Sequence, residues 1–116
     1  MKYSENQLKT LCKSNQKEFV RLLMSPGCDV STLTFGAEIL SEESSDEEIV
    51  IPVCRFLLKH IHAAVREGAM MAVATFYYNN KHVPSDILDK IKVMVSNDPS
   101  PNIKILAKDL LEDFAN

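Results

Sequence analysis

Glycine is scarce in this chain, with only three glycines among 116 residues. Phosphate-binding loops and the nucleophile elbow of hydrolases need glycines at fixed spacing, because their backbones turn tightly or approach a ligand closely. None of these motifs is present, and no cysteine and histidine form a local signature of nucleophilic catalysis. The sequence therefore predicts a protein that is not an enzyme and that needs no cofactor.

Signals for secretion and for membrane insertion are also missing. The N-terminal residues, MKYSENQLK, contain no apolar run that could serve as a signal peptide. The long uncharged run from 68 to 80 ends in two asparagines and is too short to span a bilayer. The three cysteines, Cys12, Cys28 and Cys54, are odd in number and far apart, which favours buried free thiols in a reducing compartment. We therefore expect a cytoplasmic protein with no membrane partner.

Neither sign of charge predominates, since 13 lysines and arginines oppose 16 aspartates and glutamates for a formal net charge of −3. A chain of this charge is not expected to attract nucleic acid as a whole. Its length suits one domain, residues 1–116. Strand-like alternation is almost absent, and the best candidate, 49–51, leads directly into Pro52. The sequence therefore predicts a single all-α domain.

Helical periodicity is present nearly everywhere. Ser4 with Gln7, and Ser45 with Glu48, have the spacing of capping boxes and predict two helix starts. The predicted helices cover about 5–24 with a possible break at 14–15, 29–41, 46–59 with Pro52 inside, 60–80, 86–96 and 102–114.

The helix predicted over 60–80 is rich in alanine and also contains Gly68, so we expect another helix to approach it closely. Three helices share a pattern in which a bulky residue is followed four positions later by alanine. The matching segments are 33–37, 65–69 and 103–107, each about one helix pair from the next. This spacing predicts three repeats, approximately 5–41, 45–80 and 84–116.

These residues resemble the HEAT repeats, a family of stacked antiparallel helix pairs. The segment 98–107 is similar to the family's pattern of an Asp-Pro turn followed by an Ile-Lys pair, and 65–69 matches the same helix with Val65 and Arg66. The first repeat departs from the pattern, since Thr34 replaces the basic residue. The resemblance implies a short right-handed α-solenoid of about three helix pairs that binds other proteins. It also implies that Arg66 ties neighbouring repeats together, with Asp98 as its candidate partner.

An acidic run between two predicted helices is the most distinctive charged feature. One interpretation is helix capping and solubility, and the other is a docking edge for a basic partner. Small HEAT-like chains include bacterial immunity proteins that neutralise toxins. The sharpest hypothesis is therefore an inhibitor that covers a basic toxin or nuclease through this edge or through the concave face. The acidic residues are Glu42, Glu43, Asp46, Glu47 and Glu48.

The concave face of such a solenoid is a second candidate surface, because the second helix of each pair exposes one side there. Two aromatic residues near the end of the 60–80 helix are candidate anchors at this face. An adaptor that binds a peptide or helix in this groove remains the alternative function, for a monomer or a weak dimer. The candidate residues are Glu38, Arg66, Glu67, Met70, Tyr77, Tyr78, Lys104 and Lys108.

A basic stripe on the first helix supports nucleic-acid binding only weakly. Lys9, Lys13, Lys17 and Arg21 are spaced by four, but no aromatic residues alternate with them, so a solvated face is the favoured interpretation.

A metal site is not predicted either. Residues two apart on a helix point about 200° apart. His60 and His62, if helical, cannot bind one metal ion together. We therefore expect histidines that belong to a helix junction.

Overall fold

The computed structural model describes residues 3–80 and 82–115, and these residues form helices and short connections without any strand. The prediction of an all-α chain is confirmed. The helices are α1 (Glu5–Ser14), α2 (Gln16–Leu23), α3 (Val30–Glu43), α4 (Glu47–Leu57), α5 (Ala63–Asn80), α6 (Ser85–Asn97) and α7 (Pro101–Ala115).

The start of the chain confirms both the predicted cap and the predicted break. The Ser4 hydroxyl accepts a hydrogen bond from the Gln7 N–H, and the Gln7 side chain accepts one from the Ser4 N–H, at 3.1 and 2.8 Å. Asn15 has a non-helical backbone, with φ −153° and ψ 80°, and its side chain accepts from the Glu18 N–H. One asparagine therefore ends α1 and begins α2.

The start of α4 differs from the prediction. Asp46, not Ser45, is the N-cap, and its carboxylate accepts from the Glu48 N–H at 2.9 Å. Ser44 supports this turn, since its hydroxyl accepts from the Asp46 N–H. The predicted box of Ser45 with Glu48 was wrong because a carboxylate one residue later already satisfies the first donors of the helix. Pro52 lies inside α4, as expected.

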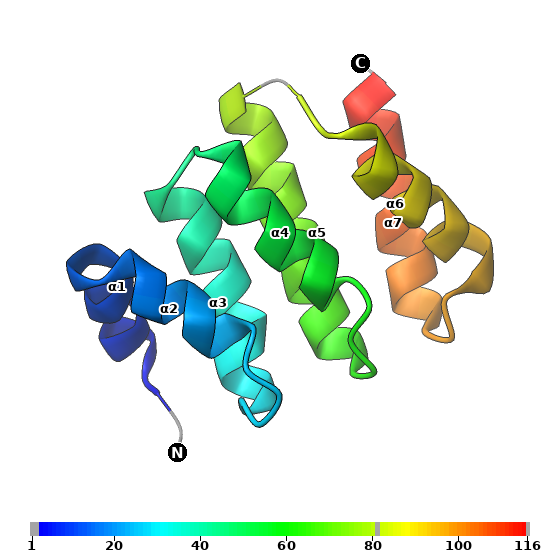
Figure 1. The fold of residues 1–116 in the computed structure, drawn as a ribbon. Helices are drawn as coiled ribbons and strands as arrows, with labels where there is room; N and C mark the ends of the chain where they lie inside the picture. Colours follow the sequence, from blue (N-terminus) through cyan, green and yellow to red (C-terminus); the bar gives the residue numbers. More distant parts are fainter. Residues whose placement is uncertain (1–2, 81, 116) are drawn as a thin grey trace.

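Figure 1 shows α2, α4 and α6 in front of α3, α5 and α7, so the helices form two layers. Within the rear layer, α3 packs extensively along α5, and α7 packs against the other side of α5. In front, α4 packs on α5 and α6 packs on α7, while α1 and α2 cover α3. The helix α5 therefore has neighbours on three sides.

The close approach of α3 to α5 depends on Gly68. A Cβ atom at this position would overlap with the carbonyl oxygen of Thr34 on α3. The expectation that small residues let another helix approach is confirmed at this point. Bulky side chains then fill the space on either side, and one continuous core includes the fully buried Phe19, Leu40 and Phe76.

The described residues have a Cα radius of gyration of 13.4 Å and extents of 36 × 28 × 19 Å. No helix among them is both long enough and apolar enough to cross a membrane.

Candidate protein-binding surface

One stripe of α5 stays exposed between its neighbours. Its exposed residues are Ala64, Glu67, Met71 and Tyr78, with Thr75 partly exposed between the last two. Steps of three, four and seven residues keep these side chains on one side of a helix with 3.6 residues per turn. Because α4 covers the front of α5 in Figure 1, this stripe belongs to the rear of the molecule.

The three rear helices present equivalent positions to the surface. In the matching segments the bulky first residue and the alanine four positions later are buried on every helix. The third residue of each segment therefore has the same orientation relative to the core, and it is exposed in all three helices. These third residues are Phe35 on α3, Glu67 on α5 and Ile105 on α7.

We call the surface formed by these stripes the outer face. It carries four of the eight large apolar side chains that are exposed among the described residues, with exposed fractions of 52% for Phe35, 38% for Met71, 54% for Tyr78 and 61% for Ile105. The other four, which are not part of this face, are Met24, Phe56, Ile61 and Val93. Its polar members are Glu38 and Glu42 on α3, Glu67 on α5, and Lys104 and Lys108, which flank Ile105 on α7.

The sequence reasoning placed Glu67, Lys104 and Lys108 correctly as exposed, and Glu38 is partly exposed. Met70 was expected on the exposed face and is fully buried, so that prediction was wrong. Its neighbour Met71 is exposed instead. The physical reason is that α7 and the connection between α6 and α7 cover the side of α5 on which Met70 and Arg66 lie, four residues apart.

Phe35, Met71 and Ile105 were missed by the sequence reasoning. Two of them, Phe35 and Ile105, occupy the third position of the matching segments. That position, midway between two buried residues of the pattern, is a signal that could have identified them.

The two tyrosines at the end of α5 have different environments. The ring of Tyr77 is partly buried and packs on Phe114 of α7, with ring centroids 4.7 Å apart. Tyr78 is exposed, and its hydroxyl donates to the carboxylate of Asp113 on α7 at 3.4 Å. Tyr77 therefore joins two helices, and Tyr78 presents ring surface to the outside.

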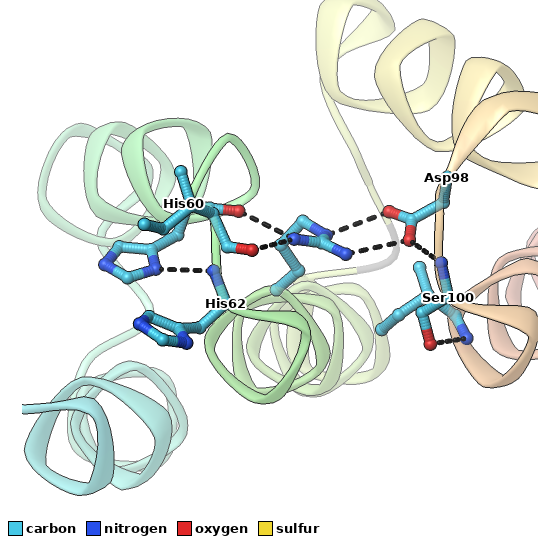
Figure 2. A network of polar contacts seen from close by, with 7 residues as sticks. His60, His62, Asp98 and Ser100 are labelled. Carbon is cyan, nitrogen blue, oxygen red and sulfur yellow. Dashed lines mark hydrogen bonds and ion pairs between the residues drawn. The ribbon is translucent and has the colours of Figure 1, made fainter.

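Arg66 of α5 contacts the turn before α7, and Figure 2 shows the polar network around His60, Asp98 and Ser100 to which this contact belongs. Its Nε and Nη2 donate to the two oxygens of Asp98, each at 2.9 Å, and its Nη1 donates to the carbonyls of His60 and Ile61. The two side chains are only 9% and 3% exposed. The contact with Asp98 that the resemblance implied is present, and a direct role of Arg66 in partner binding is not compatible with this burial.

The electrostatics of Asp98 follow from this geometry. Burial opposes ionisation, but hydrogen bonds from Arg66 and from the Ser100 N–H outweigh it and lower the pKa of Asp98. A second ion pair joins the same parts of the molecule, since Arg55 of α4 donates to both oxygens of Asp86 on α6 at 2.6 and 3.2 Å. The hydrogen bonds from Arg55 lower the pKa of Asp86. Unlike the pair of Arg66 with Asp98, this ion pair is exposed to solvent.

The acidic run is largely engaged by contacts within the chain. Asp46 caps α4, Glu43 pairs with Lys13 at 3.9 Å, and Glu47 pairs with His82 at 3.2 Å. Glu47 and Glu48 lie in the first turn of α4, where the helix dipole favours negative charge. The capping interpretation is thus supported for part of the run, while Glu42 and Glu48 form no ion pair within the described chain.

The basic stripe is compensated in a similar way. Lys9 pairs with Glu5, Lys13 with Glu43 and Arg21 with Glu18. Lys17 alone among the four has no ion pair with a described residue. These exposed pairs contribute little stability, but they reduce the positive potential that a nucleic acid would require.

His60 and His62 lie before α5, not in a helix, and their rings stack with centroids 5.4 Å apart, so the assumed divergence was wrong. No group of three or more potential metal ligands was found in the part of the chain that the structure describes. The cysteines are free thiols, and burial raises the pKa of Cys54 to about 12.

Comparison of the chain with family models, with curated proteins and with solved structures found no match. The described residues define an all-helical protein whose helices form two layers.

Proposed function

We propose that this chain is a non-catalytic protein-binding module that binds a basic partner through the outer face. The observation that carries this proposal is the exposure of Phe35, Met71, Tyr78 and Ile105 on one layer of helices. These side chains lie on adjacent helices of one layer, and exposed apolar surface of this kind commonly marks a protein-binding site when it is contiguous. Aromatic residues and methionine are also enriched in protein interfaces.

The charges of the outer face favour a partner with basic residues beside its apolar contacts. Glu38, Glu42 and Glu67 surround Phe35 and Met71 on α3 and α5, where the described residues place no lysine or arginine on the face. Opposite charge on the partner speeds the encounter and opposes wrong partners. On α7 the outer face carries Lys104 and Lys108, so its acidic part is limited to α3 and α5.

A cavity beside Phe35 is a second reason to propose the outer face as the binding surface. It has a volume of about 430 Å³ and lies between the first turns of α3 and α5, with Val30, Thr34 and Ala64 in its lining. A cavity of this kind can receive an apolar anchor side chain, which is how interface hot spots gain most of their energy.

The proposed architecture is a short right-handed α-solenoid of three HEAT-like helix pairs. The equal burial register of 33–37, 65–69 and 103–107 supports it, and so does the contact of Arg66 with Asp98 between successive pairs. In such an array the second helices line the concave side, which here corresponds to the outer face of α3, α5 and α7.

Within this proposal, the specific hypothesis is an inhibitor of the toxin-immunity type that covers the active site of a basic toxin or nuclease. An adaptor that holds a helix or peptide on the same face is the alternative. The two differ in what the partner does, because only an inhibitor abolishes a partner's enzymatic activity when the complex forms.

Two matched phenylalanines allow a direct test. Phe35 on the outer face and Phe56 on α4 in the other layer are both exposed, by 52% and 43%. A partner captured by the wild-type chain from lysate should be lost by F35S and retained by F56S. Retention by both variants would remove the outer face from consideration. An activity assay of the partner, with and without the chain, then separates an inhibitor from an adaptor.

A further inference from the structure

A small cleft lies where the α6–α7 pair meets the α4–α5 pair. Its volume is about 210 Å³. Lys59 and His60, from the connection between α4 and α5, line one side, and Lys90, Val93 and Asn97 of α6 line the other. This cleft lies at the junction of Arg66 with Asp98 and shares no lining residue with the outer face.

The charges in the cleft do not balance. Arg66 and Asp98 also line it, but they neutralise each other, since Asp98 accepts two hydrogen bonds from the guanidinium and a third from the Ser100 N–H. Lys59 and Lys90 form no ion pair with any residue that the structure describes. The cleft therefore has an excess of two positive charges within a chain of net charge −3.

His60 adds no further charge to this excess at neutral pH. Its ring stacks on that of His62, as Figure 2 shows, with the ring centroids 5.4 Å apart. Burial, with smaller contributions from the neighbouring His62 and Arg66, lowers the pKa of His60, so protonation of this ring does not add to the excess at neutral pH. Lys59 and Lys90 are the cationic donors that remain available to a ligand.

We propose that this cleft binds a small dianion with phosphate chemistry, which Lys59 holds from one side and Lys90 from the other. The apolar atoms of Val93 and Met94 in the wall strengthen the attraction, because the local dielectric constant is lower than in water. The Asn97 amide supplies an uncharged donor.

The cleft is open to solvent, and its volume of about 210 Å³ admits a phosphate group with or without a small substituent. Inorganic phosphate and the phosphate monoester of a small molecule share this chemistry. A bound dianion would also bridge the α6–α7 pair to the preceding pair and stabilise the chain in proportion to its affinity.

The test uses the full chain, without a protein partner, titrated with inorganic phosphate at constant ionic strength and followed by amide NMR shifts. We expect saturable shifts that gather at residues 58–60 and 90–99. K59Q and K90Q should each weaken binding about tenfold, as removal of one of two nearby charges predicts, and K90R should retain most of the affinity. A parallel titration with glycerol 3-phosphate distinguishes inorganic phosphate from a phosphate monoester. A higher affinity for glycerol 3-phosphate identifies a monoester as the preferred ligand.

The control is K17Q, which removes one exposed lysine of α2 that lies outside the cleft and has no ion pair with a described residue. It should bind phosphate as the wild type does. Shifts that never saturate and follow lysines over the whole surface would overturn the proposal. So would undiminished binding by K59Q combined with K90Q. Lys59 has no ion-pair partner in the described chain, so we expect K59Q to melt at the wild-type temperature without phosphate. Lys90 helps to lower the pKa of the buried Asp98 through its charge, so the melting temperature of K90Q is measured as well, which separates a binding loss from unfolding.

Discussion

Arg66 and Asp98 form a buried bidentate ion pair between α5 and the turn that precedes α7. The pair is nearly inaccessible, and the remaining donors of Arg66 are taken by the carbonyls of His60 and Ile61. One side chain thus connects the beginning of α5, the preceding connection and the C-terminal helix pair. Removing either partner would leave a buried charge without compensation, which is far more costly than losing an exposed pair.

We first predict that D98A lowers the free energy of unfolding by about 3–5 kcal/mol, as expected for one partner of a buried ion pair. Urea unfolding followed by circular dichroism measures this loss. The matched control is D86A, which breaks the exposed pair with Arg55, whose side chains are 44% and 53% exposed. Its cost should be below about 1 kcal/mol. Equal losses for the two variants would show that the burial of Arg66 and Asp98 does not matter energetically.

The second prediction concerns Gly68 at the crossing of α3 and α5. Alanine favours an exposed helix by about 1 kcal/mol over glycine. G68A should nevertheless destabilise the chain by about 1–3 kcal/mol, because its Cβ atom would overlap with the Thr34 carbonyl and force the helices apart. The thermal midpoint provides the measurement.

Gly27 is the control for this substitution, because no atom lies within 4 Å of a Cβ atom built there. G27A should change the midpoint little. A stabilised G68A would mean that α3 and α5 do not approach each other as described.

The third prediction distinguishes the two adjacent methionines of α5. M70A should cost about 2–5 kcal/mol, since it removes a fully buried side chain and leaves a cavity. M71A should stay within about 0.5 kcal/mol of the wild type, because Met71 is exposed on the outer face. The denaturant midpoints of M70A and M71A measure this difference in stability. The reverse order would place the exposed stripe of α5 one residue earlier, as the sequence reasoning had it.

The fourth prediction is a pH dependence at the start of α3. Hydrogen bonds from Ser31 and Thr32 to the carboxylate lower the pKa of Asp29 from 3.8 to about 2. Because the pKa is lower in the folded chain, the ionised carboxylate stabilises the fold above about pH 4 and loses this effect as the pH falls toward 2. The stability difference between wild type and D29N should therefore shrink across that interval.

Urea midpoints of both proteins, measured in steps from neutral pH downward, test this expectation. S31A is the informative control, because loss of the largest contribution to the shift should move the interval to higher pH. A difference between wild type and D29N that stays constant with pH would contradict the role given to these hydrogen bonds.

Much of the local structure could be read from the sequence. Ser4 and Gln7 cap α1 as their spacing indicates, Asn15 lies at the expected break, and the apolar periodicity identifies every helix to within a few residues. Local hydrogen bonds and side-chain spacing carry this information, so no distant contact is needed to interpret it. The junction at His60 was harder, because alanine-rich sequence on its C-terminal side gives no sign that the helix begins only at Ala63.

The candidate site depended on contacts that no local pattern records. Lys13 meets Glu43 because α1 and α3 pack together, and Glu47 of α4 meets His82 in the connection between α5 and α6. These contacts decide how much of the acidic run can attract a partner.

The sequence by itself therefore determined an all-helical chain, its helix boundaries and the repeated segments that resemble HEAT repeats. Tertiary structure alone decided that Met71 faces the solvent and Met70 the core, since three helices pack around α5 and leave one narrow stripe uncovered. A helix with small or apolar residues on nearly all sides carries too weak an amphipathic signal to specify that stripe. The orientation of α5 is set by the helices that pack against it. Gly68 allows the close approach of α3, and Arg66 binds Asp98 in the turn before α7.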